Sequence, residues 1–273
     1  MRDIEFYKMS GSGNDFILID NRRNQLDVTP RSRLARALCR RRMSVGADGL
    51  IIIENSDKAD FKWHFLNSDG SEGEMCGNGA RCAARFAYLN GIAGSKMAFE
   101  TRAGRIHAEI DDARVKIRMT DPHGLSMGET LKMDDRVRTV HRINTGVPHV
   151  ILAVEDIEGV AIESLGPAIR HHPQFAPDGT NVNFIQPLSD KTIAIRTYER
   201  GVEAETLACG TGAVASAIVA SRLFHMEPPL VMMTRSGLPL EVTFTGSGNR
   251  FEAACLKGDA RVIYRARLGE DAQ

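Results

Sequence analysis

Short apolar runs bounded by turn-forming residues recur along the whole chain. Runs of this kind, whether continuous or alternating with polar residues, predict β-strands that are buried on one or both faces. In the first half of the chain they are Ile4–Met9, Phe16–Asp20, Gly49–Glu54, Asp60–Leu66, Lys96–Thr101 and Arg105–Ile110. In the second half they are Thr139–Asn144, Val150–Val154, Asn181–Gln186, Ile193–Tyr198, Leu230–Thr234 and Leu240–Thr245.

Three segments interrupt the strands with sequence typical of helices. Two of them, Ala80–Asn90 and Ala213–His225, each follow a Cys-Gly-x-Gly motif. Gly91 closes the first and Pro228 follows the second, as expected of residues that end helices. A third helix is predicted over Arg31–Met43. Strands and helices together predict a protein of the α/β (α+β) class.

The two Cys-Gly-x-Gly motifs belong to a longer internal repeat. Cys76-Gly77-Asn78-Gly79-Ala80 and Cys209-Gly210-Thr211-Gly212-Ala213 are separated by 133 positions (209 − 76). The same shift superimposes four further pairs: Thr101-Arg102-Ala103-Gly104 on Thr234-Arg235-Ser236-Gly237, Gly13-Asn14-Asp15-Phe16 on Gly146-Val147-Pro148-His149, Gly46-Ala47-Asp48-Gly49 on Gly179-Thr180-Asn181-Val182, and Glu72 on Glu205. A period this long excludes a solenoid and predicts two similar lobes related by pseudo-symmetry.

The boundary between the lobes is expected near residues 120–128, where Asp121-Pro122-His123-Gly124 is typical of a turn. We therefore predict an N-terminal lobe over residues 1–122 that carries Cys76, and a C-terminal lobe over residues 123–262 that carries Cys209.

Charge and cysteine usage narrow the class of protein. The chain of 273 residues has 35 Lys and Arg against 35 Asp and Glu, a balance that gives no reason to expect nucleic acid or an anionic membrane as partner. No apolar run is long enough for a transmembrane helix, and acidic residues come too early for a signal peptide. Five widely spaced cysteines, an odd number, indicate a reducing compartment, so we expect a cytoplasmic protein.

Several motifs that could suggest other functions lack the required context. Gly11-Ser12-Gly13 has no third glycine of a dinucleotide fingerprint, and no Walker lysine is present. The basic run Arg40-Arg41-Arg42 is more typical of a solvated helix end than of a nucleic-acid site. Neither Cys-x-x-Cys nor His-x-x-x-His spacing occurs, which disfavours zinc. His171-His172 is read as a surface pair near a helix end.

A cysteine followed by two glycines and a helix combines three chemical properties. The glycines let the backbone turn tightly and let a ligand approach the main-chain N–H groups. Those N–H groups lie in the first helical turn, where unpaired donors and partial positive charge bind anions and favour a thiolate. Each motif therefore predicts an activated thiol beside a carboxylate cradle. For Cys39, Cys82 and Cys255, which lack this context, we expect small buried hydrophobic residues.

Two such motifs on opposite sides of an α-carbon would invert it. The thiolate on one face removes the α-hydrogen and the thiol on the other face delivers a proton, while both helix N-termini stabilise the charged carboxylate. Cys76 and Cys209 are therefore predicted to be the acid and base of an amino-acid racemase or epimerase without a cofactor.

These residues also carry a resemblance to a known family. The stretches Lys8–Phe16, Asn67–Cys82, Tyr198–Gly201 and Glu205–Gly212 resemble the diaminopimelate epimerases, and the similarity extends to Arg235-Ser236-Gly237. The resemblance implies interconversion of LL- and meso-diaminopimelate in lysine and peptidoglycan precursor biosynthesis, without pyridoxal phosphate or metal. It also implies a homodimer whose lobes are each a bent mixed sheet around a central helix, with residues 263–273 packing back on the first lobe.

The resemblance assigns roles to individual residues. Cys76 and Cys209 match the catalytic pair, and His149 and Glu199 match residues that tune the ionisation of the thiols. The substrate-binding positions are matched by Asn14, Asn67, Gly77, Asn78, Asn181, Glu199, Arg200, Gly210 and Thr211. Among these, Arg200 would hold the distal carboxylate with its planar guanidinium.

Some positions depart from the family pattern. Ser10 stands where histidine is usual, Gly49 where many members have glutamine, and Val147 where asparagine is common. One extra residue also lies between Arg200 and Cys209. These departures leave open a racemase of another amino acid on the same fold. A proton-moving isomerase without paired thiols and a non-catalytic amino-acid-binding protein are weaker alternatives, since thiols prone to oxidation suit mere binding poorly.

Overall fold

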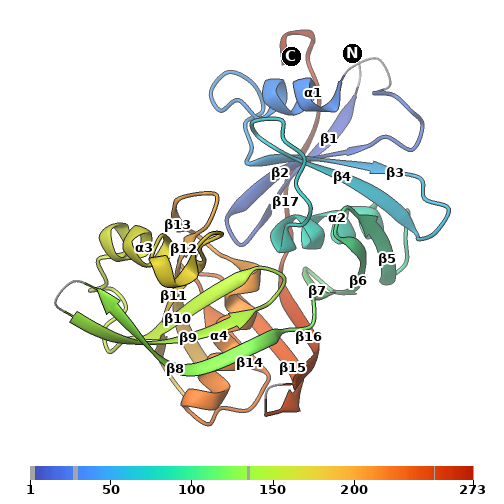
Figure 1. The fold of residues 1–273 in the computed structure, drawn as a ribbon. Helices are drawn as coiled ribbons and strands as arrows, with labels where there is room; N and C mark the ends of the chain where they lie inside the picture. Colours follow the sequence, from blue (N-terminus) through green and yellow to red (C-terminus); the bar gives the residue numbers. More distant parts are fainter. Residues whose placement is uncertain (1–3, 27–29, 134–135, 249, 273) are drawn as a thin grey trace. The chain divides into compact units, whose positions relative to one another are not determined.

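The structure is a computed structural model that describes residues 4–26, 30–133, 136–248 and 250–272. The predicted lobe limits at residues 1 and 273 therefore lie outside the described residues. The chain divides into two compact units, unit 1 with Met1–Ile117 and Gly258–Gln273 and unit 2 with Arg118–Lys257. Each unit has its own series of paired strands and its own buried helix, shown as ribbons in Figure 1.

Unit 1 is a mixed sheet bent around one helix. Its strands pair in the order β17-β1-β2-β3-β4-β5-β6-β7, with β2–β3 and β4–β5 parallel and the other pairs antiparallel. The strands are β1 (Glu5–Gly11), β2 (Asn14–Asp20), β3 (Gly49–Glu54), β4 (Phe61–Asn67), β5 (Lys96–Thr101), β6 (Gly104–Asp111), β7 (Arg114–Arg118) and β17 (Arg261–Arg267). Helix α2 (Gly77–Leu89) contacts β1, β2, β3 and β6, so the sheet curves around it. Helix α1 (Arg31–Leu38) packs on β3 and β4, and a short 3-10 helix, η2 (Glu270–Ala272), follows β17.

Unit 2 repeats this plan. The strands pair in the order β8-β9-β10-β11-β12-β14-β15-β16, again with the third and fifth pairs parallel, and β13 lies against the end of β12. They are β8 (His123–Met133), β9 (Arg136–Asn144), β10 (Pro148–Ala153), β11 (Asn181–Pro187), β12 (Thr192–Glu199), β13 (Ala204–Thr206), β14 (Leu230–Met233), β15 (Pro239–Ser247) and β16 (Arg250–Asp259). Helix α4 (Gly210–Leu223) contacts β9, β10, β11, β12, β14 and β15, while α3 (Ile162–Arg170) and the 3-10 helix η1 (Pro173–Phe175) lie between β10 and β11 in the chain.

The shared strand order confirms the predicted duplication and fold class, and the register refines the alignment of the two halves. In the parallel pair β2–β3, Phe16 lies opposite Gly49. In the matching pair β10–β11, His149 lies opposite Asn181. Gly49 therefore corresponds to Asn181, one position earlier than the constant shift of 133 predicts. The alignment over this strand was wrong by one residue because two differences in spacing cancel. The chain from His149 to Asn181 is one residue shorter than that from Phe16 to Gly49, and the segment before Cys209 is one residue longer than that before Cys76.

Other differences from the predicted elements have local causes. Helix α1 ends at Leu38 rather than at Met43, because the chain turns back so that the N–H of Gly46 donates to the carbonyl of Leu38 at 2.9 Å. The expected turn at residues 121–124 is the start of β8 instead. Gly124 and Gly128 adopt positive φ there, and the two breaks in register let the strand continue through them.

Helices α2 and α4 each begin three residues before the predicted start, at the glycine directly after the cysteine. The glycines therefore form the first helical turn and are not part of the preceding loop. Both helices are deeply buried; nine residues of α2 and nine of α4 are buried. Each is thus the centre of its unit, and its N-terminus is fixed by the surrounding sheet.

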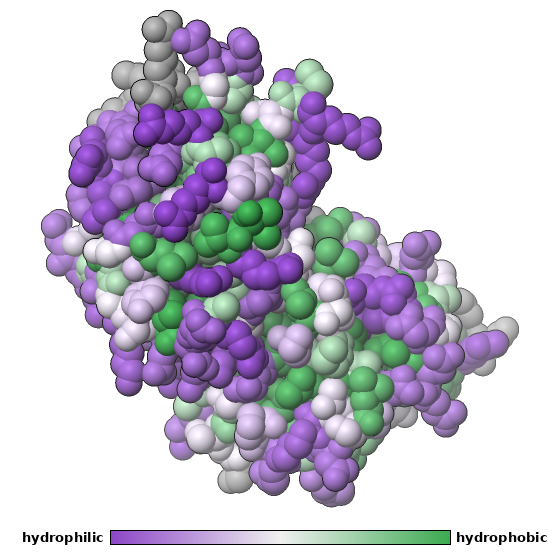
Figure 2. All heavy atoms as spheres, turned by 180° about the vertical axis from the view of Figure 1, so that it is seen from behind, coloured by the Kyte–Doolittle hydropathy of each residue, from purple (hydrophilic) through white to green (hydrophobic). Residues whose placement is uncertain are grey.

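On the face drawn in Figure 2, hydrophilic side chains cover most of the surface, with hydrophobic ones between them. Met43 and Val137 are among the most exposed large apolar side chains, at 68% and 69%. None of the helices within the described ranges is both long and apolar enough to cross a membrane.

Candidate active site

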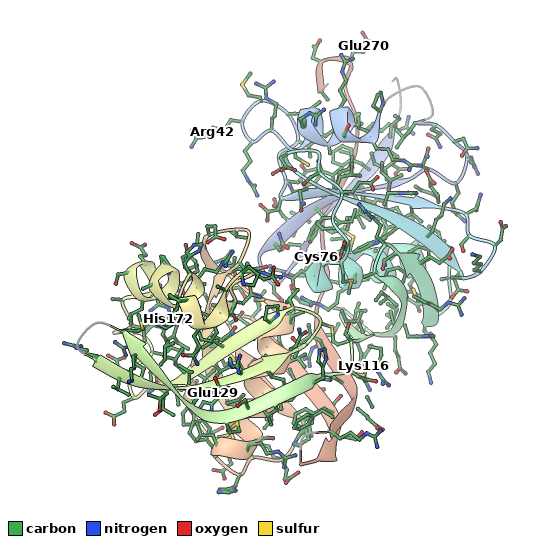
Figure 3. The ribbon with its side chains drawn as sticks, in the orientation of Figure 1. Arg42, Cys76, Lys116, Glu129, His172 and Glu270 are labelled. Atoms are coloured by element: carbon green, nitrogen blue, oxygen red, sulfur yellow. The ribbon has the colours of Figure 1, made fainter. Side chains whose placement is uncertain are left out.

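Cys76 caps the N-terminus of α2 (Figure 3). Its backbone is extended, with φ −142° and ψ 116°, and its sulfur accepts a hydrogen bond from the N–H of Gly79 at 3.5 Å. The thiol in turn lies 3.6 Å from Oδ1 of Asn14, to which it can donate. The sulfur is therefore placed on the N–H groups of the first helical turn, where negative charge is stabilised.

Cys209 has the same position in unit 2. It caps α4 with φ −112° and ψ 115°, and its sulfur accepts from the N–H of Gly212 at 3.4 Å. The hydroxyl of Thr211 lies 3.4 Å from the same sulfur. Cys209 is buried, with 7% of its surface exposed, whereas Cys76 is half-buried. Two cysteines at equivalent places in the repeat thus have equivalent contacts with a helix N-terminus.

The glycines of the two motifs are required by close packing. A Cβ on Gly212 would lie 2.4 Å from Oδ1 of Asn183 on the strand below. A Cβ on Gly79 would lie 3.3 Å from Ile51 and 3.5 Å from Phe16. In unit 2 only glycine lets the helix N-terminus lie this close to the sheet, whereas in unit 1 a Cβ would make a tight contact.

The predicted binding residues of unit 1 surround Cys76 in part. Asn14 begins β2 and donates to Oδ2 of Asp48 at 2.6 Å, which leaves its Oδ1 turned to the Cys76 thiol. Asn78 is buried in the first turn of α2, where its Oδ1 accepts from Arg81 at 3.0 Å. Asn67 ends β4 with an exposed side chain that donates to Ser71 at 3.0 Å. Asn14 thus contacts the Cys76 thiol directly.

A charged cluster beneath Asn14 fixes its position. Asp15 receives hydrogen bonds from both terminal nitrogens of Arg41, at 2.6 and 3.1 Å, and pairs with Lys8 at 2.8 Å. Burial alone would raise the pKa of Asp15, but the bonds from Arg41 and Lys8 outweigh it and lower the pKa to about 2. Arg41 also binds Asp48, the partner of Asn14, at 2.9 Å. The amide of Asn14 is therefore held by an ionised network.

In unit 2, Asn181 joins two other predicted site residues. Its Oδ1 accepts from the backbone N–H of Arg200 at 2.8 Å, and its amide nitrogen donates to the carbonyl of Pro148 at 3.0 Å, directly before His149. The guanidinium of Arg200 donates to the carbonyl of Asp178 at 3.3 Å. Burial raises the pKa of Glu199, which precedes Arg200 at the end of β12. Asn181, Arg200, Glu199 and His149 are therefore gathered at one end of strands β10, β11 and β12.

The first turns of both helices carry the remaining predicted cradle residues. Gly77 and Gly210 are the first residues of α2 and α4, and Asn78 and Thr211 are the second. The carbonyl of Thr211 accepts from Thr145 at 3.0 Å, which ties the turn to the loop after β9. Gly49, one of the positions that differ from the family pattern, is the first residue of β3. At Gly49 a Cβ would lie 2.7 Å from the Phe65 ring, so no side chain fits there without a shift.

One residue that sequence reasoning quoted but gave no role is Arg81, on the second turn of α2. It is fully buried and donates to Ser12 Oγ at 2.9 Å, to Asn78 Oδ1 at 3.0 Å, and to the carbonyls of Gly77 and Asp259 at 3.3 and 3.1 Å. Burial lowers the pKa of Arg81. The only signal in the sequence was its place in the Cys76 motif. Arg81 ties the cradle residues Gly77 and Asn78 to the returning C-terminal segment.

Comparisons with known proteins identify the family of the chain. The family model described as diaminopimelate epimerase matches residues 6–124 and 142–263. A diaminopimelate epimerase of Aquifex aeolicus (strain VF5) is 47% identical, over 98% of this chain and 99% of the relative. One of Hydrogenobaculum sp. (strain Y04AAS1) is 46% identical, over 96% and 97%.

Solved structures show the same fold at low sequence identity. A phenazine biosynthesis protein of the PhzF family from Bacillus anthracis has a TM-score of 0.73 at 15% identity, covering 98% of this chain and 100% of that one. A hydroxyproline epimerase from Agrobacterium vitis has a TM-score of 0.68 at 16% identity, covering 99% and 94%. The match of the family model over most of the chain, together with relatives of this identity, settles the assignment: the chain belongs to the diaminopimelate epimerase family.

Proposed function

We propose that this protein is an isomerase that interconverts LL- and meso-diaminopimelate, a step of lysine and peptidoglycan precursor biosynthesis, with Cys76 and Cys209 as the proton-transferring pair. The observation that carries the proposal is the repeated cap. In each unit a cysteine sulfur accepts a hydrogen bond from the third residue of the following helix, at 3.5 Å in unit 1 and 3.4 Å in unit 2.

The reaction breaks and forms one C–H bond. One cysteine, as thiolate, takes the α-proton, and the electron pair of the broken bond is delocalised onto the α-carboxylate. The other cysteine, as thiol, delivers its proton to the opposite face of the same carbon. The sum is an inverted centre and exchanged protonation states of the two sulfurs, so no other reactant is consumed. The half-buried and buried settings of the two sulfurs favour such transfer by limiting water.

The helix N-termini give the α-carboxylate its binding groups. The backbone N–H groups of Gly77-Asn78 and Gly210-Thr211 belong to first turns, whose donors have no partner within the helix. An anion there gains from the helix dipole, and the gain increases as negative charge develops in the transition state. Arg81 supports this function in unit 1, since it holds Gly77 and Asn78 in place.

The distal end of the substrate carries a second carboxylate and an amino group. Arg200 suits the carboxylate, because a guanidinium binds carboxylate oxygens through two parallel hydrogen bonds. Asn67 and Asn181 offer amide groups to the same end, Asn14 offers one beside the Cys76 thiol, and Glu199 offers a buried acceptor to an ammonium group. His149 and Glu199 influence the ionisation of the thiols. The observation that favours a dicarboxylate is the fixed position of Arg200 on Asn181.

We also propose a homodimer in the cytoplasm that needs neither pyridoxal phosphate nor metal. The proton transfer described above is complete with the two sulfurs, and the family relationship supports the assembly. Cys39, Cys82 and Cys255 carry free thiols, in keeping with a reducing compartment.

Proton NMR in deuterated water tests the reaction and the substrate together. LL-diaminopimelate with reduced enzyme should lose the α-hydrogen signal at one centre while the meso product appears. Cys76→Ala and Cys209→Ala should each abolish this epimerisation, whereas Cys255→Ala, a matched removal of a thiol outside the motifs, should leave it unchanged. Epimerisation that survives with both motif cysteines replaced would overturn the two-thiol mechanism. Inactivity of the unaltered enzyme on diaminopimelate, with turnover of another amino acid, would overturn the substrate.

A further inference from the structure

The first turns of α2 and α4 each pack on a group of sheet side chains, here called the floor. The floor is apolar in unit 1 and polar in unit 2. Each floor consists of three side chains, from the third, fourth and fifth strands in the pairing order of its unit. In unit 1 they come from β2, β3 and β4, and in unit 2 from β10, β11 and β12. The floors are Phe16, Ile51 and Phe65 in unit 1, and His149, Asn183 and Thr197 in unit 2.

Strand register makes these positions equivalent. Ile51 lies two residues after Gly49 and pairs with Phe65 across the antiparallel ladder. Asn183 lies two residues after Asn181 and pairs with Thr197 in the matching ladder. Since Gly49 and Asn181 correspond, the two cross-strand pairs correspond as well. The first members, Phe16 and His149, lie opposite Gly49 and Asn181, as described above.

The floor of unit 1 is apolar. The rings of Phe16 and Phe65 meet edge to face with centroids 6.0 Å apart. Ile51, Phe16 and the Trp63 ring of β4 lie directly below Gly79, 3.3, 3.5 and 3.4 Å from where its Cβ would be. The side chains of Phe16, Ile51 and Phe65 have no group that donates or accepts a hydrogen bond, so these three support the Cys76 turn by shape alone.

The floor of unit 2 is a chain of hydrogen bonds. Thr197 donates from its hydroxyl to Oδ1 of Asn183 at 3.0 Å. The amide nitrogen of Asn183 lies 3.1 Å from Nδ1 of His149 and donates to the carbonyl of Val150 at 3.2 Å. Asn183 is completely buried, and His149 and Thr197 are 1% and 3% exposed. Oδ1 of Asn183 is also the atom directly below Gly212 in the Cys209 turn.

These bonds determine which nitrogen of His149 carries the proton. A carbonyl can only accept, so the atom of Asn183 that faces Val150 must be its amide nitrogen. The same amide group faces Nδ1 of His149, which must therefore be an acceptor without a proton. A neutral imidazole then carries its proton on Nε2.

The Nε2 atom is buried and has no hydrogen-bond partner among the residues that the structure describes. Burial, with the positive charge of Arg200 added, lowers the pKa of His149 to about 3. The ring is therefore neutral at physiological pH, and it presents one N–H donor that the fold itself leaves unused. A buried donor without a partner is rare in native proteins and indicates a ligand or a reacting group.

We propose that Asn183 and Thr197 are positioning residues that fix His149 as the neutral Nε2–H tautomer, so that His149 serves as a hydrogen-bond donor to an anionic acceptor and not as a base. This inference rests on the proposed function for its role in turnover, but the tautomer itself is a property of the resting protein. Because Phe16 occupies the equivalent position in unit 1, only unit 2 has this donor, and the two halves of the repeat are chemically unequal.

Nitrogen-15 NMR of the histidine rings in the free, reduced enzyme tests the tautomer directly. The His149 signals are assigned by their loss in His149→Gln. We expect an unprotonated Nδ1 and a protonated Nε2 whose shifts stay constant between about pH 5 and 8, where an ordinary histidine titrates. A protonated Nδ1 with a bare Nε2, or titration within this range, would overturn the proposal. This measurement needs no substrate, so it stands whether or not diaminopimelate is turned over.

Variants test the role of Asn183 and Thr197 in positioning His149. Asn183→Asp replaces the donor to Nδ1 by an acceptor of the same shape, and should move a proton onto Nδ1, restore titration, and lower kcat by roughly 10- to 100-fold with a smaller change in KM. Thr197→Ser keeps the hydroxyl and should retain the wild-type ring signals and pH profile, whereas Thr197→Val removes the hydroxyl and should perturb both. Ile51→Val, at the position equivalent to Asn183, is the matched control and should leave the ring signals unchanged.

The outcomes separate the two proposals. Unchanged ring signals in Asn183→Asp would show that Asn183 does not set the tautomer and would overturn the inference. If Asn183→Asp fails to fold, the nitrogen-15 spectrum of the unaltered enzyme still shows whether His149 is the Nε2–H tautomer, and so still tests the proposal. An Nε2–H tautomer in an enzyme inactive on diaminopimelate would uphold the tautomer while refuting the proposed substrate.

Discussion

Asn181 holds Arg200 by its backbone: Oδ1 of Asn181 accepts from the Arg200 N–H at 2.8 Å. The guanidinium of Arg200 is thereby directed from a fixed point at the end of β12. Asn181→Leu, which removes the acceptor at nearly constant volume, should raise KM for diaminopimelate by about tenfold with a smaller effect on kcat, since a displaced cation loses ground-state and transition-state binding alike. Steady-state kinetics measures this. An unchanged KM would show that the bond does not position Arg200.

The identity of the cation at position 200 should also matter. Arg200→Lys keeps the charge but loses the planar fork that binds two carboxylate oxygens at once. We expect KM for diaminopimelate to rise by about 10- to 100-fold, a loss on the order of one charge-assisted hydrogen bond. Thermal unfolding should be unaffected, because Arg200 is only half-buried. Arg222→Lys, far along α4, serves as a control of the same chemistry and should leave KM unchanged.

Removal of the buried guanidinium at Arg81 should cost both stability and activity. Arg81→Met leaves Ser12 and Asn78 without their buried donor, and we expect a loss of about 2–4 kcal/mol. Urea unfolding followed by circular dichroism gives the change in midpoint. Arg85→Met provides a comparison on the same helix, because Arg85 is less buried and donates to the carbonyl of Ala260. Equal midpoints for the two variants would contradict a special role of Arg81.

The Asp15 cluster predicts a specific loss of stability in acid. The pKa of Asp15 is about 2 in the folded protein, below its ordinary value near 4, so the folded state holds the proton less tightly than the unfolded chain. The stabilisation is thus complete above about pH 4 and is lost as pH falls towards about 2. It amounts to at most about 2 kcal/mol. Asp15→Asn should be destabilised at pH 7 and show a flatter decline between pH 4 and 2, whereas exposed Asp57→Asn should follow the unaltered protein. Parallel curves for Asp15→Asn and the unaltered protein would refute the assignment.

The cysteines should differ in reactivity towards alkylating reagents. Burial raises the pKa of the Cys39 thiol to about 12 and raises that of Cys82 as well, so neither forms thiolate near pH 8. Cys76 is half-buried on a helix N-terminus and should react first with iodoacetamide, as read by peptide mass spectrometry over time. Substrate should slow this reaction. Modification of Cys39 or Cys82 at the rate of Cys76 would show that the resting fold opens on that timescale.

Much of this architecture could be predicted from the pattern of residues. The repeat at a shift of 133 predicted two units of one topology, and the Cys-Gly-x-Gly motifs predicted where the central helices begin to within three residues. Helix α3 was predicted only through its end, where His171-His172 was read as a pair near a helix end; its bounds were not predicted, because Gly166 and Pro167 in its middle argue against a helix. A fixed shift also could not detect that Gly49 corresponds to Asn181, since only strand pairing shows the one-residue slip.

The side chains that form the two floors could not be predicted from the sequence, for another reason. Phe16 and His149 matched at the shift of 133, but nothing in the chain indicates that Asn183 and Thr197 are their neighbours across two strands. Buried polar groups are recognised by their partners, and the partners come from separate strands. Arg81 was hidden similarly, because an arginine on a helix is usually exposed and its partner Asp259 lies 178 residues away.

The division of unit 1 into two chain segments has a consequence for synthesis on the ribosome. Unit 2 is continuous over residues 118–257, whereas unit 1 needs residues 258–273, which are translated after it. The edge of β1 that pairs with β17 therefore stays unpaired until the whole of unit 2 has been translated. Arg81 lacks the carbonyl of Asp259 over the same interval. The half of the protein that is translated second can thus complete its fold first, and the nascent N-terminal half carries an open strand edge throughout that interval.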